Sequence, residues 1–277
     1  MPIVHAIVLG LVQGLSEFLP ISSSGHLILV PWLFGWDDFD GNESVAKAFD
    51  VSLHIGTLIA VVAYFRRELM VYVREGLRLV FERRQPTTVD GRIAWLLVLA
   101  TVPAALVGAV FEDQIDERLG KPWIIGVSLI VFGIVLWLAD RLKGTRRLEQ
   151  FSAREALMVG AAQALALNPG TSRSGITITA ARWTDFDRDA AARLSFLMSV
   201  PVIAGAVVLK VGRLIVDGIP DGLLAPMLVG IATSAVSGWV AVWGTMRLIR
   251  TRSFTPFVVY RIVAGTAVLI ILASGWR

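Results

Sequence analysis

The sequence contains no cysteine and few charged residues. Without cysteine, the chain can form neither disulfide bonds nor thiolate metal sites. Charged residues make up 17% of its 277 positions, whereas an average soluble domain carries about 25%. Hydrophobic residues make up 55% and occur in long blocks. This composition excludes an ordinary soluble domain and indicates a multispanning membrane protein.

Long apolar runs predict six transmembrane helices. Three of these runs carry no charge: residues 93–111, 122–139 and 222–246. Each can cross a hydrocarbon layer of about 30 Å as a helix. Three weaker candidates are residues 51–65, 194–209 and 253–276. We expect no cleavable signal peptide, because no basic region precedes the first apolar run.

Two more apolar segments are interrupted, which makes them poor candidates for crossing the membrane. Pro20 divides residues 1–36, because proline removes a backbone donor and clashes with the preceding turn. The limb at residues 23–34 would measure only about 18 Å as a helix. Residues 153–181 have the same form, with a break at Asn168-Pro169-Gly170. We expect two re-entrant helical hairpins, which a membrane tolerates only where protein or a water-filled cavity surrounds them.

The two interrupted segments also match each other in sequence. "GLVQGLSEFLPISSSGH" (residues 10–26) aligns with "GAAQALALNPGTSRSGI" (residues 160–176) at an offset of 150. Shorter matches at an offset of 132 pair residues 100–101 with 232–233, and Gly133 with Gly265. The two consistent offsets predict an internal duplication.

The duplication divides a single membrane domain into two repeats. Residues 1–145 hold the hairpin at 1–36 and three transmembrane helices. Residues 150–277 hold the hairpin at 153–181 and three more. Because an odd number of crossings gives the repeats opposite orientations, the predicted fold class is an all-α polytopic membrane protein with an inverted-topology repeat.

Basic residues are concentrated in three loops, and loops rich in lysine and arginine lie on the cytoplasmic side. The three loops carry Arg66, Arg67, Arg74, Arg78, Arg83, Arg84 and Arg92; Arg141, Lys143, Arg146, Arg147 and Arg154; and Arg247, Arg250 and Arg252. We expect these loops to contact lipid headgroups rather than nucleic acid. In this orientation the break at Pro20 opens to the outer face.

Arg173 is the only charged residue between positions 156 and 181. An arginine at the bilayer centre costs at least about 2.5 kcal/mol, so it indicates a functional site. Serine hydroxyls and backbone amides around a guanidinium form a receptor for a tetrahedral oxyanion such as phosphate. The other break supplies Glu17, Ser23 and His26: a carboxylate, a hydroxyl nucleophile and an imidazole. Together these groups predict phosphoryl transfer.

The segments "QGLSEFLPISSSGH" and "PGTSRSGIT" resemble the two signature motifs of the undecaprenyl-diphosphatase family, also called bacitracin-resistance proteins. The length and layout of nearly the whole chain are similar to that family as well. The resemblance implies an enzyme of the bacterial inner membrane that hydrolyses undecaprenyl diphosphate to undecaprenyl phosphate and inorganic phosphate. This reaction recycles the lipid carrier for peptidoglycan synthesis.

The resemblance also implies roles for individual residues. The catalytic residues it implies are Glu17, Ser23, His26 and Arg173. The phosphate-binding residues it implies are Arg173, Ser172, Ser174, Thr177, Ser22 and Gly170. It implies a divalent cation, Mg²⁺ or Ca²⁺, held by Glu17 and Gln13. Because Gln13 is not ionisable, Glu17 is the only carboxylate at this break, which weakens the case for a two-carboxylate metal site.

Several alternatives stay open on the sequence alone. Ser23 could attack phosphorus, with His26 or Glu17 taking its proton, or water could attack directly with His26 as the base. Arg173 and Glu17 could form a structural ion pair across the two breaks. Inverted repeats with broken helices are also typical of secondary transporters, so a lipid-phosphate flippase or anion transporter is the alternative function. A homodimer is a further open prediction.

Overall fold

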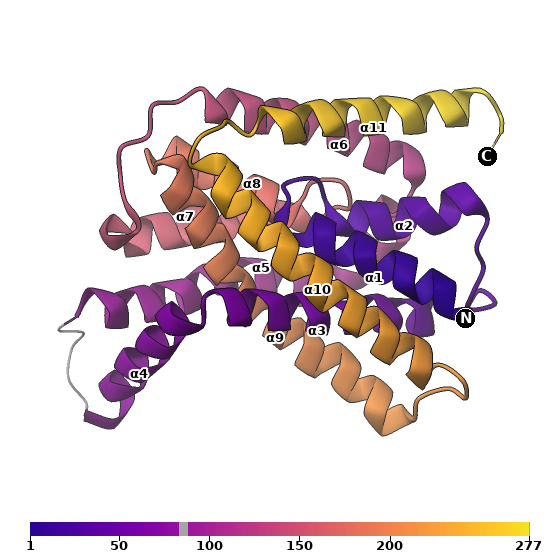
Figure 1. Cartoon of the computed structure of the whole chain (residues 1–277), viewed down its shortest axis with the longest axis horizontal. Helices are drawn as coiled ribbons and strands as arrows, with labels where there is room; N and C mark the ends of the chain where they lie inside the picture. The colour runs from indigo at the N-terminus through magenta and orange to yellow at the C-terminus, as the bar shows by residue number, and fades with distance from the viewer. Residues whose placement is uncertain (83–87, 277) are drawn as a thin grey trace.

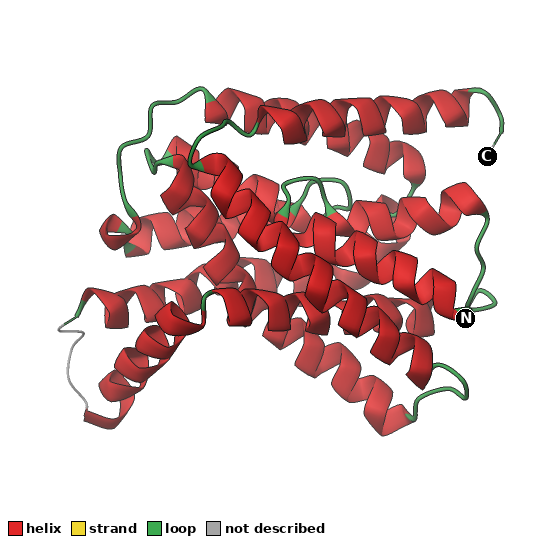
Figure 2. Ribbon diagram, in the orientation of Figure 1, coloured by secondary structure: helices red, strands yellow, loops and turns green. Residues whose placement is uncertain are grey.

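The computed structural model describes residues 1–82 and 88–276, and within these it omits the side chains of residues 43, 79, 82, 112–117, 210, 211 and 213–217. The described chain is built from helices (Figures 1 and 2). They are α1 (Ile3–Phe18), α2 (Ser23–Phe34), α3 (Glu43–Tyr64), α4 (Arg66–Glu82), α5 (Val89–Leu119), α6 (Pro122–Asp140), α7 (Ala153–Ala164), α8 (Arg173–Trp183), α9 (Arg188–Asp217), α10 (Leu224–Ile249) and α11 (Thr255–Ala273), with short 3-10 helices η1 (Leu148–Gln150) and η2 (Leu165–Leu167). Arg83 and Arg84 lie outside the described residues.

Six helices of the described chain are long and apolar enough to cross a membrane, which confirms the predicted number. They contain the segments Ser44–Tyr64, Val89–Phe111, Pro122–Asp140, Arg188–Leu209, Leu224–Ile249 and Thr255–Ala273. The fourth segment begins six residues before the predicted run at 194–209. Its early charges are held by ion pairs, Arg188 with Asp140 at 2.5 Å and Arg193 with Glu68 at 2.7 Å.

One helix was missed by the sequence prediction, which assigned residues 66–92 to a loop. The structure instead places α4 over most of this segment. Tyr72 and Gly76, four residues apart, are buried, and Gly76 contacts α5, while the arginines of α4 are exposed. A segment rich in charge can therefore still be an amphipathic helix.

The two predicted helix breaks are present. α1 ends at Phe18 and α2 begins at Ser23, while α7 ends at Ala164 and α8 begins at Arg173. The loops that form the breaks lie side by side near the centre of the molecule, in contact through Ser22 and Gly170 (Figure 2). We call the loop at residues 19–22 the first tip and the loop at residues 168–172 the second tip.

Both tips end in a serine with the same unusual backbone. Ser22 has φ 79° and Ser172 has φ 75°, in the left-handed region that non-glycine residues rarely adopt. The Ser22 hydroxyl accepts a hydrogen bond from the amide of Gly25 at 3.4 Å, and that of Ser172 accepts one from Gly175 at 3.1 Å. The two serines therefore cap α2 and α8 in the same way.

α7 is fixed at its start by a capping box. The amide of Ser152 donates to the Glu155 carboxylate at 3.0 Å, and Arg146 Nη1 donates to Glu155 Oε1 at 3.1 Å. Burial raises the pKa of Glu155, but these hydrogen bonds outweigh it and lower the pKa to about 2. The carboxylate is therefore ionised at neutral pH, and its stabilising effect is lost only as the pH falls below about 4.5 toward 2.

Glycines allow α1 to pack closely on α10, beside which it lies in Figure 1. A Cβ atom on Gly14 would lie 2.0 Å from Ser237 Oγ and 2.5 Å from the Ser234 carbonyl oxygen. A Cβ atom on Gly160 of α7 would lie 2.4 Å from the Ala100 carbonyl oxygen of α5. The helices that precede the tips, α1 and α7, therefore each pack through a glycine against a long helix. Such glycine contacts are common between helices in membranes.

We expect Gly14→Ala to destabilise the protein, because the added methyl group overlaps the backbone of α10. The loss in unfolding free energy should be about 1–3 kcal/mol, the usual cost of overpacking. Thermal unfolding of the purified protein in detergent measures it. Gly244→Ala is the matched control, since no atom lies within 4 Å of a Cβ atom there. Equal midpoints for the two variants would contradict the proposed close contact.

Candidate active site

Glu17 lies at the centre of the site, at the end of α1, with a buried side chain. Its Oε1 accepts hydrogen bonds from Arg173 Nη2 at 3.0 Å and Arg173 Nε at 3.3 Å. Its Oε2 accepts one from Ser23 Oγ at 2.7 Å and one from Gln13 Nε2 at 3.1 Å. His54 Nε2 of α3 lies 3.5 Å from the same oxygen. One carboxylate therefore connects α1, α2, α3 and α8.

Arg173 is the first residue of α8 and connects the two tips. In addition to its contacts with Glu17, its Nη1 donates to the carbonyl oxygen of Ser195 in α9 at 2.7 Å. The predicted ion pair across the breaks is thus present, and it neutralises a charge that would otherwise be costly within a membrane. The side chain is mostly buried, with 12% of its surface exposed.

Serine hydroxyls join the tips to each other. Ser22 Oγ accepts a hydrogen bond from the Gly170 amide at 3.0 Å. Ser174 Oγ donates to the Leu19 carbonyl oxygen at 3.1 Å and lies 3.2 Å from Ser172 Oγ. These three serines are buried. Their hydroxyls are already used within the protein, and their predicted role as phosphate ligands stays a prediction.

Thr177 is directed toward α9 rather than toward the tips. Its hydroxyl lies 2.8 Å from Ser195 Oγ and donates to the Arg173 carbonyl oxygen at 2.8 Å, and the residue is fully buried. The accessible polar side chains in the first turns after the tips are instead Ser23, Ser24, His26 and Arg173. The backbone amides of Ser23 and Ser24 lie in the first turn of α2, and those of Arg173 and Ser174 in the first turn of α8. Backbone N–H groups at this position attract anions.

His26 is held by two contacts. Its Nδ1 lies 2.7 Å from the Ser22 carbonyl oxygen, which only accepts, so Nδ1 carries the proton in this contact. In the neutral ring Nε2 then accepts from the hydroxyl of Tyr260 in α11 at 2.7 Å, and the two rings stack with centroids 5.6 Å apart. The hydroxyl of Ser23 donates to Glu17 instead of His26. Of the two predicted bases, Glu17 and His26, it is therefore Glu17 that contacts the Ser23 hydroxyl directly.

Arg261 fastens both tips to the rest of the protein. Its fully buried guanidinium donates to the Pro20 carbonyl oxygen of the first tip at 3.0 Å. It also donates to the carbonyl oxygens of Gly170 and Thr171 in the second tip, at 2.8 Å and 3.0 Å. A bond to the Leu129 carbonyl oxygen at 3.1 Å attaches the group to α6.

Sequence reasoning missed four residues of this site: His54, Ser195, Tyr260 and Arg261. Each lies on one of the long helices outside the two interrupted segments. The one available signal was Arg261, a charge interrupting an apolar run. Such a buried charge indicates a partner in the protein interior, but it does not identify that partner.

The residues present fit a divalent cation only in part. Among the described residues, no three histidine or acidic side chains are grouped to hold a metal ion. The Oε1 atom of Gln13, however, is buried and has no hydrogen-bond partner among the described residues. This oxygen and the Glu17 carboxylate could supply two ligands to Mg²⁺, which commonly binds one or two carboxylates and completes its shell with water and substrate phosphates.

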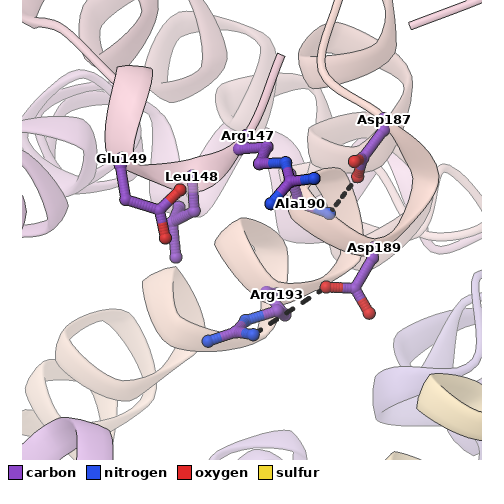
Figure 3. A pocket seen from close by; sticks show the side chains of 7 residues that line it. All are labelled: Arg147, Leu148, Glu149, Asp187, Asp189, Ala190 and Arg193. Carbon is purple, nitrogen blue, oxygen red and sulfur yellow. Dashed lines mark hydrogen bonds and ion pairs between the residues drawn. The ribbon is translucent and has the colours of Figure 1, made fainter. Parts of the chain in front are cut away.

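A cavity of about 310 Å³ lies between α1, α2 and α3. Its lining includes Leu9, Leu27 and Asp50. These residues lie one helical turn from Gln13, Ser23 and His54, respectively, so the cavity ends close to the site. A smaller cavity of about 170 Å³, shown in Figure 3, is lined by Arg147, Leu148, Glu149, Asp187, Asp189, Ala190 and Arg193. Neither cavity is lined by any of the predicted site residues.

The fold and the site define a polytopic, all-helical membrane protein with a carboxylate, a hydroxyl and a guanidinium joined at its centre. The family model for bacitracin resistance protein BacA matches residues 6–267. A curated relative from Geobacter sulfurreducens, named undecaprenyl-diphosphatase, is 49% identical over 271 residues, covering 97% of this chain and 98% of its own. The relative of that name from Elusimicrobium minutum is 45% identical over 267 residues, covering 96% and 97%. The chain belongs to the BacA family of undecaprenyl-diphosphatases, which confirms the resemblance.

We expect Arg261→Lys to destabilise the two tips although the positive charge is kept. Lysine lacks the planar fork that reaches several carbonyl oxygens at once. Each buried carbonyl left without a donor should cost about 1–3 kcal/mol. Thermal unfolding in detergent measures the loss, and Arg154→Lys on the exposed surface is the control. An unchanged midpoint for Arg261→Lys would show that its hydrogen bonds do not hold the tips.

Proposed function

We propose that this chain is an integral-membrane phosphatase that hydrolyses undecaprenyl diphosphate to undecaprenyl phosphate and inorganic phosphate. The observation that carries the proposal is the Glu17 carboxylate, which binds Arg173 of the second tip and the Ser23 hydroxyl beside the first. The nearly full-length relatives that carry this enzyme name support the same reaction. The product returns the lipid carrier to peptidoglycan synthesis in the bacterial inner membrane.

The fold that serves this function is an inverted-topology repeat of residues 1–145 and 150–277, each beginning with a re-entrant hairpin. α1 and α2 have 16 and 12 residues, which correspond to only about 24 Å and 18 Å of helix. The matching backbone of Ser22 and Ser172, 150 positions apart, supports the duplication. α5 and α10 correspond at the offset of 132, and α1 packs on α10 as α7 packs on α5.

From the arginine-rich loops we infer that the start of α9 and the end of α10 lie at the cytoplasmic face. The opposite end of the molecule holds the acidic loop with Asp37 and Asp38, which line the larger cavity. This cavity ends near the site, so the site opens to the outer face, where it would receive its substrate. The apolar part of the cavity lining is suited to the first units of a lipid chain.

In the reaction, the diphosphate binds at the exposed part of Arg173 and at the free amides of α2 and α8. Ser23 Oγ attacks the terminal phosphorus, and Glu17 takes the hydroxyl proton. The bond from this phosphorus to the bridging oxygen breaks, releasing undecaprenyl phosphate, and water then hydrolyses the phosphoserine. A cation bound by Glu17 and Gln13 would neutralise phosphate charge.

Direct attack by water is less compatible with the geometry, because Tyr260 occupies the basic nitrogen of His26. A transporter is the alternative from another functional class. Transport of an anion requires Arg173 but not a serine hydrogen-bonded to a carboxylate, and an unneutralised carboxylate repels phosphate. The 2.7 Å contact between Ser23 and Glu17 therefore favours hydrolysis.

The function is tested by phosphate release from a long-chain prenyl diphosphate with purified protein in detergent. We expect Arg173→Ala to lower kcat/KM about 100- to 1,000-fold, the usual effect of removing one donor to a developing oxyanion. Arg154→Ala is the control. Activity lost in EDTA and restored by Mg²⁺ would support the cation. Substrate binding by the wild-type protein without release of phosphate would favour the transporter.

We expect Ser23→Ala to abolish turnover, because no hydroxyl then remains to attack phosphorus. Wild-type protein quenched in acid after mixing with substrate labelled in its terminal phosphate should carry a labelled phosphoserine at position 23. Ser24→Ala, which changes the adjacent exposed hydroxyl, should keep most of the activity. A fully active Ser23→Ala protein would exclude the covalent step and leave direct water attack.

A further inference from the structure

α4 has an apolar face that nothing in the described chain covers. The face consists of Met70, Val73, Leu77, Val80 and Phe81, all exposed, with Met70 at 63% and Phe81 at 80%. Their spacing of three and four residues places them along one side of the helix. We call these five residues the outer face of α4. An unbroken apolar row of this kind on a helix indicates a surface that binds lipid or protein.

The adjoining side of α4 is fixed against the bundle. Tyr72 is buried there, and Trp95 Nε1 of α5 donates to the Gly76 carbonyl oxygen at 3.2 Å. A Cβ atom on Gly76 would lie 3.2 Å from the Cβ atom of Ala94, so the two helices are in close contact. Because this contact fixes the rotation of α4, the outer face lies beside the contact with α5 and remains exposed.

Charges are distributed unequally around α4. At about 100° of rotation per residue, Arg67, Arg74 and Arg78 lie on the side of α4 next to the outer face. Glu68 and Glu75 lie further around the helix axis from it. Glu68 binds Arg193 of α9 at 2.7 Å, and Glu75 accepts a hydrogen bond from Arg78 at 2.9 Å. The edge of the outer face is therefore basic, with Arg78 of this edge paired to Glu75, while Glu68 binds another helix.

α4 lies at the end of the molecule that holds the basic loops, from which it projects obliquely (Figure 1). Arg92 at the start of α5 donates to the Glu149 carbonyl oxygen at 2.7 Å, which places this region beside η1. An apolar face bordered by arginines, at the end of a set of membrane spans, matches an interfacial helix. Such helices embed the apolar face among acyl chains and place their cations at the headgroups.

We propose that α4 lies in the headgroup region of the bilayer, with its outer face in the acyl layer, and that Arg67, Arg74 and Arg78 bind anionic phospholipid headgroups. Charge complementarity favours anionic phospholipid as the partner of this surface. A second copy of the chain docking through the same face would bring its own arginines against these three, whereas phosphatidylglycerol supplies the opposite charge. The proposal is independent of the phosphatase reaction.

The absence of native cysteine allows a direct test, because a fluorophore can be attached to Leu77→Cys alone. The labelled full chain is placed in nanodiscs of phosphatidylcholine that contain a few per cent of an acyl-labelled acceptor lipid. The acceptor carries either a phosphatidylglycerol or a phosphatidylcholine headgroup. The ratio of energy transfer to the two acceptors measures local enrichment of the anionic lipid around α4.

We expect enrichment of phosphatidylglycerol of at least fivefold, since each arginine near an anionic surface is worth about a fivefold preference. The variant Arg67→Gln/Arg74→Gln/Arg78→Gln should reduce the ratio to near one and keep its phosphatase activity in detergent. The matched control, Arg147→Gln/Arg154→Gln/Arg252→Gln, removes three exposed arginines from the other basic loops and should keep the enrichment.

Three results would overturn the proposal. One is a ratio near one in the wild-type background, and another is an unchanged ratio in the α4 triple variant. The third is formation of a disulfide-linked dimer by unlabelled Leu77→Cys in the bilayer, which would show that a second copy covers the outer face. A label at Met70→Cys repeats the measurement at an independent position of the same face.

Discussion

The requirement to satisfy backbone groups inside a membrane governs this structure. Two helix breaks leave carbonyl and amide groups in the protein interior, where each unsatisfied group would cost several kcal/mol. Arg261 supplies donors to carbonyls of both tips, and Ser22 and Ser174 supply the remaining links between them. The first tip depends on donors from the second half of the chain, and the second tip uses Ser22 of the first half as well as Arg261 of its own half. Their convergence therefore follows from the breaks, and the site exists because the two tips must meet.

This requirement also separates structural polar groups from functional ones. The hydroxyls of Ser22, Ser174 and Thr177 are buried and bonded within the protein, although their sequence context makes them look like ligands. Ser23 and His26 remain partly exposed at the same tip. The serine run at the first tip thus contains neighbouring residues with opposite tasks: position 22 holds the loop, and position 23 presents a hydroxyl beside Glu17. Motif membership alone does not distinguish these tasks, because the distinction depends on which way each side chain points.

Much of the fold could be predicted because its signals are local. Uncharged runs indicate spans, and Pro20 and Asn168-Pro169-Gly170 mark the two helix breaks. Glu17, Ser23 and Arg173 could be named from their motifs and from the cost of charge in a membrane. The partners of these residues could not be predicted, since Tyr260 and Arg261 are more than 230 positions from the first tip, as the separations of their hydrogen-bonded pairs show. α4 was missed for a different reason: its arginines resemble a loop until the apolar residues between them are placed on a helix.

The ion pair between Glu17 and Arg173 joins two roles of the proposed reaction, because Arg173 would bind the diphosphate and Glu17 would take the proton of Ser23. A buried ion pair contributes little net stability, because desolvation offsets the attraction, yet either partner alone would be strongly destabilising. In the free protein the pair keeps both charges compatible with the apolar surroundings. An arriving diphosphate competes with Glu17 for the guanidinium, so binding weakens the hold of Arg173 on the carboxylate. A carboxylate that loses its cation becomes more basic, and this one already accepts the hydrogen bond of Ser23. In the proposed reaction, substrate binding would therefore make Glu17 a stronger base when Ser23 must lose its proton.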